Sequence, residues 1–232
     1  MSEVRVVAAG DAALVAEFDD RLDVAVNARA IALAQALRHA SLPGVRDIVP
    51  AYRTVTVYFD PLRTDAPALE SRMRVAAPAA LDARAPAAPL VHVPVCYDDE
   101  FGPDLEVVAR FAGLSVREVV DLHLSREYRV FMLGFVPGFA YMGTVDPRIA
   151  APRRSGPRTA VAAGSVAIAG EQTGVYPRQT PGGWNLIGRT PMALVSFERA
   201  VPSLFAAGDR VRFHQVDRAT FAQVARVQEL GP

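Results

Sequence analysis

The chain has 232 residues, 51% of them hydrophobic, and its 25 basic side chains balance 25 acidic ones, which excludes the bulk positive charge that favours nucleic acid or anionic membranes. All 25 basic residues are arginines, and the absence of lysine excludes a Schiff-base lysine, covalently attached pyridoxal phosphate or biotin, and a P-loop lysine. The single cysteine, Cys96, excludes an internal disulfide and favours the cytoplasm, a reducing compartment.

The first third of the chain alternates short β-rich runs with helical periods. The apolar residues that recur at spacings of four and three, as in an amphipathic helix, are Val26, Ala30, Leu33 and Leu37. The predicted elements are strands at residues 4–8, 12–18, 45–49 and 54–59 and helices at 23–40 and 67–75. Residues 76–89, rich in Ala and Pro, predict a linker and a domain boundary near residue 86. We expect helices on one face of an antiparallel sheet before this boundary, and no secretory signal in residues 1–20.

The remainder of the chain begins with a strand and two short helices and then becomes mostly β. Ser115 and Glu118 have the spacing of a capping box, which predicts a helix start. The predicted elements are strands at residues 90–96, 192–197 and 210–214 and helices at 104–112, 115–124 and 219–227. Strand and turn signals alternate from Arg129 onward. We therefore expect a closed β-barrel with two helices.

Glycine, proline, arginine and single aromatics are concentrated in residues 128–191. The run GFVPGFAY at residues 134–141 fits either a ligand-binding loop with an apolar wall or a barrel corner with packed aromatics. The arginines of this region are Arg153, Arg154, Arg158, Arg178 and Arg189. Their planar guanidinium groups suit a carboxylate or a phosphate, and the alternative is a solvated surface.

Two further glycine-rich segments carry polar or aromatic side chains. Residues 170–174 predict a turn in which Gln172 and Thr173 face a ligand, or a plain hairpin. Residues 181–184, with the sequence PGGW, fit an anion-binding nest or a tight turn pinned by the indole.

The remaining chemistry-bearing residues form no recognisable catalytic pattern. The histidines, which lack metal-site spacing, are His39, His92, His123 and His214. We interpret Cys96 as a small buried thiol, because no local nucleophile signature surrounds it. The acidic cluster at residues 98–104 is interpreted as a solvated loop or helix start. No catalytic residue and no metal site are therefore assigned.

Four segments together resemble one bacterial family. They are GFVPGFAYM, APRRSGPRTAVAAGSVAIAG, EQTGVYPRQTPGGWNLIGRTP and PVCYDDEFGPDLEVVA. The family is that of the 5-oxoprolinase B subunit, also named allophanate hydrolase subunit 1, and it includes the sporulation-kinase inhibitor KipI. The chain also resembles part of the carboxyltransferase domain (subdomains C and D) of urea carboxylase. The resemblance covers nearly the whole chain, and its departures, Met142, Ala162 and Thr180, concern loop geometry.

The resemblance implies an α+β fold with a ferredoxin-like domain at residues 1–86 and a cyclophilin-like β-barrel domain at residues 87–232. It implies partners, the C and A subunits of 5-oxoprolinase, and an ATP-dependent complex that opens the lactam 5-oxo-L-proline to L-glutamate. ATP is expected at the level of the complex, and neither nucleic acid nor a membrane is expected as a partner. The substrate-binding positions carried over are Phe135, Pro137, Gly138, Arg158, Gln172, Thr173, Tyr176, Gly182, Gly183, Trp184 and Arg189.

Our leading hypothesis is a non-autonomous subunit of this enzyme. A phosphorylated lactam oxygen would need hydrogen-bond donors, for which Arg158, Arg189 and the Gly182 or Gly183 amides are the expected groups. One alternative is a KipI-like inhibitor that docks on a histidine kinase. Another is a carboxyltransferase or allophanate-hydrolase-like component, which would need a biotinylated partner because this chain has no lysine.

Overall fold

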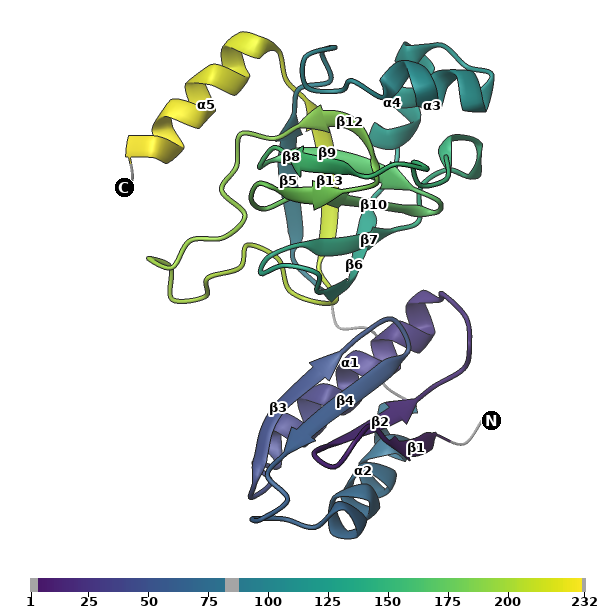
Figure 1. Ribbon diagram of the computed structural model, residues 1–232, viewed down its shortest axis with the longest axis vertical. Helices are drawn as coiled ribbons and strands as arrows, with labels where there is room; N and C mark the ends of the chain where they lie inside the picture. Colours follow the sequence, from purple (N-terminus) through teal and green to yellow (C-terminus); the bar gives the residue numbers. More distant parts are fainter. Residues whose placement is uncertain (1–3, 82–87, 231–232) are drawn as a thin grey trace. The chain divides into compact units, whose positions relative to one another are not determined.

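The computed structural model describes residues 4–81 and 88–230 and divides the chain into two compact units, Met1–Ala88 and Pro89–Pro232 (Figure 1). The boundary predicted near residue 86 lies outside the described residues. Each unit has its own hydrophobic core. None of the helices in the described ranges is both long and apolar enough to cross a membrane.

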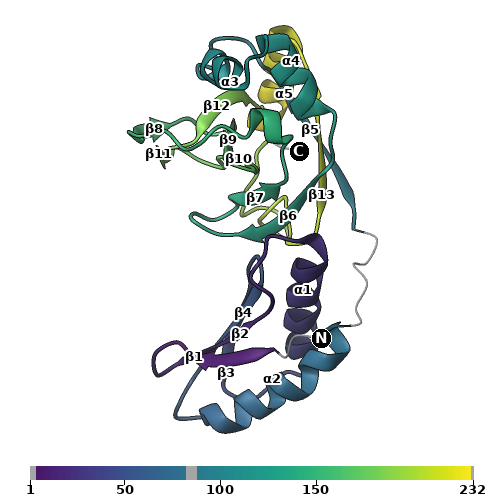
Figure 2. The same cartoon turned by 90° about the vertical axis from the view of Figure 1, so that its right-hand side faces the viewer.

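The first unit is a four-stranded antiparallel sheet covered on one face by two helices (Figure 2). Its strands, in the sheet order β1-β2-β4-β3, are β1 (Arg5–Ala8), β2 (Ala13–Glu17), β4 (Thr54–Phe59) and β3 (Val45–Pro50). The helices are α1 (Val24–His39) and α2 (Ala66–Leu81). Helix α1 begins where the Asp23 carboxylate accepts hydrogen bonds from the Ala25 and Val26 amides. Its apolar face is fully buried, as the periodicity predicts.

Helix α2 is longer than predicted. Residues 76–81, expected to belong to a linker, continue the helix through Pro78. Ala77 and Ala80 are buried four and seven residues beyond Met73, on the face that packs into the core. Burial of this face therefore outweighs the hydrogen bond that the proline removes.

The second unit is built around a seven-stranded, barrel-like sheet with the order β12-β9-β10-β7-β6-β13-β5. Its strands are β5 (Leu90–Val95), β6 (Tyr128–Leu133), β7 (Ala140–Gly143), β9 (Ser165–Ala169), β10 (Gln172–Val175), β12 (Asn185–Arg189) and β13 (Arg210–Gln215). The two edges meet just beyond β5, where the Cys96 and Arg189 backbones exchange hydrogen bonds of 2.9 Å in both directions. The barrel is therefore nearly closed.

Short elements surround this barrel. They are α3 (Leu105–Ala112), α4 (Val116–Leu124), the 3-10 turn η1 (Pro147–Ile149), α5 (Arg218–Leu230) and a two-stranded ribbon of β8 (Arg158–Val161) and β11 (Thr180–Gly182). The ribbon projects from the side of the barrel (Figure 2). The predicted capping box is confirmed, because Ser115 and Glu118 bond each other's backbone amides at the start of α4.

Two sequence predictions in this unit are wrong. The strand predicted at 192–197 is an irregular segment with only one bridge, between Val195 and Ser203. Gln172 and Thr173, predicted in a turn, lie within β10, and the turn itself is limited to Gly170 and Glu171. The pairing of β10 with β9 confirms the hairpin alternative, and β10 also pairs with β7, a long-range contact that is not visible in a local pattern.

Candidate functional site

Five aromatic side chains gather beside the ribbon on the second unit, and we call them the aromatic cluster. They are Phe135, Phe139, Tyr141, Tyr176 and Trp184. Phe139 lies at the centre, with its ring centroid 4.8 Å from that of Tyr141, 5.2 Å from that of Tyr176 and 5.5 Å from that of Trp184. All of these contacts are edge-to-face, the favourable geometry for aromatic pairs. The cluster joins the 134–139 loop to β7, to the end of β10 and to the start of β12.

Two glycines provide the space for these rings. A Cβ on Gly174 would lie 3.1 Å from Phe139 and 3.2 Å from Trp184. A Cβ on Gly182, in β11, would lie 2.4 Å from the hydroxyl oxygen of Tyr176. Because real Cβ atoms do not approach this closely, glycine at position 182 lets the ribbon lie directly against the Tyr176 hydroxyl.

The loop that carries Phe135 has a strained backbone. Phe135 has a φ of 68°, a left-handed conformation that is rare for an aromatic residue, and it is 57% exposed. Gly138 in the same loop has a φ of 82°, and a Cβ there would overlap Val195. Exposed aromatics held in strained loops are typical of ligand-binding sites. This loop therefore presents the Phe135 ring at the outer edge of the cluster.

One arginine lies on the face of this cluster. The guanidinium carbon of Arg153 is 5.8 Å from the centroid of the Trp184 ring, within cation–π range. Arg153 is exposed, and no carboxylate of residues 4–81 and 88–230 pairs with it. Burial raises the pKa of the nearby Tyr176 hydroxyl, and the positive charges of Arg153 and Arg158 oppose that shift. Tyr176 is therefore a neutral hydroxyl beside a cationic group.

The other two arginines of this segment are bound to a single buried carboxylate. Arg158 binds Asp104 in bidentate fashion with both N–O distances at 2.9 Å, and Arg154 donates to the same carboxylate at 2.8 Å. The Leu186 amide also donates to Asp104, at 2.8 Å. Asp104 is 3% exposed, and it connects the start of α3 to β12 and to the ribbon. The helix-start alternative for residues 98–104 is therefore confirmed at Asp104, the N-cap residue of α3, but the expectation that this side chain is solvated is wrong.

Sequence reasoning missed the burial and the arginine pairing of Asp104, because its arginine partners are 50 and 54 residues away. The available signal was an acidic residue within an apolar-flanked helix start, together with two arginines four positions apart. The substrate role predicted for Arg158 stays a prediction. Its two terminal nitrogens are already bound to Asp104.

A buried polar chain runs through the barrel interior. His123 lies 2.8 Å from the Tyr97 hydroxyl through Nδ1 and 3.0 Å from the Thr173 hydroxyl through Nε2. Thr173 donates its own proton to the Ala167 carbonyl, so His123 donates from Nε2 and accepts the Tyr97 proton at Nδ1. Burial lowers the pKa of His123 to about 3. His123 is therefore a neutral structural residue, and Thr173 supports the core.

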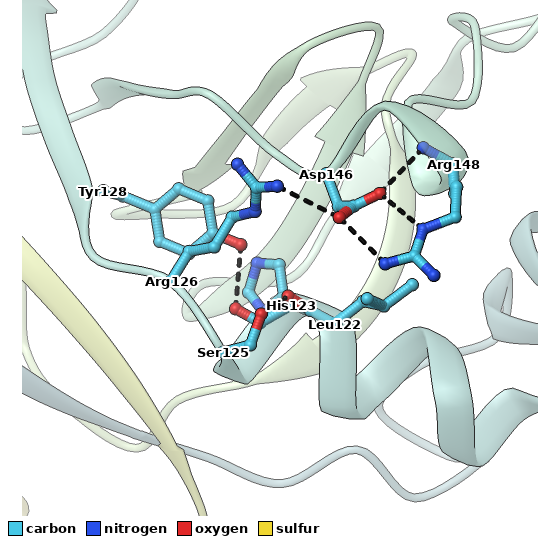
Figure 3. A network of polar contacts seen from close by, with 7 residues as sticks. All are labelled: Leu122, His123, Ser125, Arg126, Tyr128, Asp146 and Arg148. Atoms are coloured by element: carbon cyan, nitrogen blue, oxygen red, sulfur yellow. Dashed lines mark hydrogen bonds and ion pairs between the residues drawn. The ribbon is translucent and has the colours of Figure 1, made fainter.

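A second polar network fixes the C-terminal end of α4, the helix that carries His123 (Figure 3). Asp146 accepts hydrogen bonds from Arg126 at 3.0 Å and from Nε of Arg148 at 2.9 Å. Hydrogen bonding to Arg148 is the main reason that the pKa of Asp146 is lowered. The Tyr128 hydroxyl donates to the His123 carbonyl at 2.8 Å. These contacts tie the end of α4 to β6 and η1, and they leave Asp146 fully engaged with arginines.

The chain's single cysteine is not an activated nucleophile. Cys96 is fully buried, and burial raises the pKa of its thiol, which disfavours the reactive thiolate. Within residues 4–81 and 88–230, no group of three or more His, Cys, Asp and Glu side chains is placed to hold a metal ion. The site therefore consists of an aromatic face, an arginine and backbone amides.

Arg189 lies in a separate groove of about 460 Å³. Its Nε donates to the Ala163 carbonyl at 2.8 Å. The groove is also lined by Gly164, Pro177, Thr190, Met192, Val195 and Phe221. Val195 and Pro177, which line the groove, are also the nearest neighbours of Gly138, so the groove borders the 134–139 loop.

The eleven predicted site residues thus fall into three groups. Those in the aromatic cluster, its loop and the ribbon beside it are Phe135, Pro137, Gly138, Arg158, Tyr176, Gly182, Gly183 and Trp184. Gln172 and Thr173 lie on β10, with Thr173 inside the barrel. Arg189 faces the groove. Arg153 is the addition that the geometry makes to the first group.

Comparison with known proteins places the chain in a family. The profile of the carboxyltransferase domain, subdomain C and D, matches residues 4–205. The 5-oxoprolinase B subunit of Bacillus subtilis (strain 168) is 40% identical over 227 residues, which cover 91% of this chain and 92% of that protein.

Solved structures show the same relationship. The crystal structure of TTHA0988 has 40% sequence identity and a TM-score of 0.79 over 88% of this chain, and this chain covers only 40% of that longer one. The urea amidolyase of K. lactis shares the fold, with a TM-score of 0.79 over 96% of this chain and 15% of that chain at 20% identity. The chain therefore belongs to the family of the carboxyltransferase domain, subdomain C and D, and its curated relatives in that family are 5-oxoprolinase B subunits.

Proposed function

We propose that this chain is the B subunit of a 5-oxoprolinase complex and that it acts with the A and C subunits to open 5-oxo-L-proline to L-glutamate at the expense of ATP. The observation that carries the proposal is the 40% identity to a 5-oxoprolinase B subunit over nine-tenths of both chains. The lone buried thiol of Cys96 is consistent with the cytoplasm as the place of action.

The site chemistry supports a non-autonomous role. Opening a lactam with ATP begins when the lactam oxygen accepts the terminal phosphoryl group and ADP leaves. Water then adds to the activated ring carbon, and the tetrahedral intermediate releases phosphate and breaks the ring C–N bond as the nitrogen takes up a proton. These steps need a phosphoryl donor site and a group that activates water. Neither His123, which is neutral and buried, nor Cys96, whose thiol pKa is raised by burial, is suited to activate water. In this proposal the chain binds and orients the lactam, and the partner subunits contribute the ATP site.

The aromatic cluster is the part of the chain that we assign to the lactam. It combines an exposed ring, Phe135, with the cation of Arg153. Backbone amides of Gly182 and Gly183 border it and remain candidates for donors to the lactam oxygen. Arg189 lies in the separate groove, so we place it outside the part of the site that we assign to the lactam.

We also propose finer fold relationships for the two units. In the first unit, the order β1-β2-β4-β3 supports a ferredoxin-like variant, because β2, α1, β3, β4 and α2 follow that topology and β1 fills the remaining sheet edge. In the second unit, the nearly closed barrel with peripheral helices supports a cyclophilin-like domain.

The test is reconstitution with candidate A and C subunits. ATP hydrolysis dependent on 5-oxo-L-proline and release of L-glutamate are measured for the full mixture and with each subunit omitted. We expect turnover only in the full mixture. No turnover in a mixture that assembles by size-exclusion chromatography, or full turnover without this chain, would contradict the proposal.

A further inference from the structure

We propose that Arg153, which lies over the indole of Trp184, is the residue that binds the carboxylate of the substrate. The inference rests on the proposed function for the identity of the ligand, a small flat lactam that carries one carboxylate. It assigns Arg153 as a specificity-determining residue that distinguishes such acids from neutral lactams.

The first argument is the availability of the charge. Arg153, Arg154 and Arg158 belong to one short segment, but Asp104 neutralises only the last two. Arg153 keeps an uncompensated positive charge, since no carboxylate in the described ranges pairs with it. A guanidinium group without an ion pair is the group that a ligand carboxylate can engage in bidentate fashion.

The second argument is position. Stacking at 5.8 Å over Trp184 restrains the Arg153 side chain beside the aromatic cluster. An arginine that is already oriented loses less conformational entropy when it binds an anion. The indole is itself fixed, because Trp184 is 4% exposed and packs edge-on against Phe139 at 5.5 Å. The cation is therefore preorganised on a rigid support.

The third argument is the surface beside the cation. Phe135 is 57% exposed and lies edge-on to Tyr176, with ring centroids 6.5 Å apart. The Tyr176 hydroxyl itself is covered, because Tyr176 is 2% exposed and the Gly182 backbone lies directly against it. The cluster therefore offers two exposed groups, the Phe135 ring and the Arg153 guanidinium group. A five-membered lactam acid presents the matching features, namely a flat ring and a carboxylate.

The first experiment uses Trp184 as a probe, since it is the only tryptophan of the chain. The intrinsic fluorescence of the full-length chain is titrated with 5-oxo-L-proline and, separately, with neutral 2-pyrrolidinone. We expect a saturable change with 5-oxo-L-proline for the wild type and a Kd raised about tenfold or more in Arg153→Gln, the cost of a lost charged hydrogen bond. Arg153→Lys should recover part of the affinity, and 2-pyrrolidinone should bind both forms equally.

The matched control is Arg110→Gln, which removes another exposed arginine of the same unit, away from the aromatic cluster. It should titrate as the wild type does. A wild-type titration that does not saturate overturns the proposal. The same conclusion follows if Arg153→Gln binds 5-oxo-L-proline as tightly as the wild type.

The second experiment separates this inference from the proposed function. In the reconstituted complex, Arg153→Gln should raise KM for 5-oxo-L-proline about tenfold or more and leave KM for ATP unchanged. An active complex with an unchanged KM overturns the role of Arg153 and keeps the proposed function. If the complex has no activity but the fluorescence titration depends on Arg153, the proposed function is contradicted and the carboxylate site is supported.

Discussion

At the scale of single residues, Asp104 decides how the arginines of the site are used. It is nearly fully buried and accepts hydrogen bonds from two guanidinium groups and one backbone amide. A buried carboxylate is tolerated only when its oxygens are satisfied in this way. Asp104 therefore holds Arg154 and Arg158 in structural roles and leaves Arg153 as the cation for a ligand.

Removal of this carboxylate should be costly. Asp104→Ala is expected to lower the free energy of unfolding by about 2–3 kcal/mol, somewhat below the usual loss for a broken buried pair, because the arginines are partly exposed and regain water. Urea denaturation gives this value. The control is Asp121→Ala, which breaks an exposed i,i+4 pair with Arg117 and should cost about 0.5 kcal/mol. Equal losses in the two variants would show that Asp104 is not a structural centre.

A second residue-scale expectation concerns pH. His123 has an ordinary pKa of 6.5 when unfolded and about 3 in the fold, so between these values the unfolded state binds the additional proton. Stability from this residue is present above pH 6.5 and is lost as pH falls, by up to about 1.4 kcal/mol per pH unit.

The measurement is the free energy of unfolding between pH 6.5 and pH 5, a window above the ordinary pKa of carboxylates. His123→Gln should show a shallower slope than the wild type. Identical slopes would show that His123 is not held neutral in the fold. The comparison of slopes also removes the contribution of His214, whose pKa is lowered by burial and by His92.

At the scale of elements, the ribbon of β8 and β11 owes its position to one glycine. Gly182 pairs with Arg158 across the ribbon and contacts the Tyr176 hydroxyl. Gly183, the next residue, is different, because its nearest possible Cβ contact is Pro157 at 3.7 Å, an ordinary distance. The two neighbouring glycines therefore form a matched pair for mutation.

Gly182→Ala should displace β11 from Tyr176 and lower the free energy of unfolding by about 1–3 kcal/mol, the usual cost of overpacking. It should also weaken the tryptophan response to 5-oxo-L-proline. Gly183→Ala should change stability by less than about 0.5 kcal/mol. Chemical denaturation and the fluorescence titration test both statements, and a larger effect at position 183 than at 182 would contradict the assigned ribbon geometry.

Elements with a local cause were predictable. The strand at residues 54–59 and the helix capped by Ser115 follow from β-branched runs and a capping box. The failures have a non-local cause. Residues 76–81 are helical because Ala77 and Ala80 complete a face buried in the first unit's core. Residues 192–197 form only one bridge, from Val195 to Ser203, so an apolar run alone did not produce a strand.

At the scale of the whole molecule, the chain consists of two units with separate cores. The second unit is closed by long-range pairing, since β5 lies beside β13 from the other end of that unit and Cys96 pairs with Arg189. Closure brings residues from position 104 to position 186 to one side of the barrel. The site is therefore a product of topology, and none of its segments forms it alone.

The sequence by itself determined the periodic elements, the exclusion of lysine chemistry and the family resemblance, because these depend on neighbouring residues and on composition. Only the tertiary structure decided which arginine is available. Arg153 and Arg154 are adjacent and chemically identical, yet a carboxylate 50 residues from Arg154 binds it, and an indole supports Arg153. Charge neutralisation depends on distance in space, and distance along the chain does not predict it.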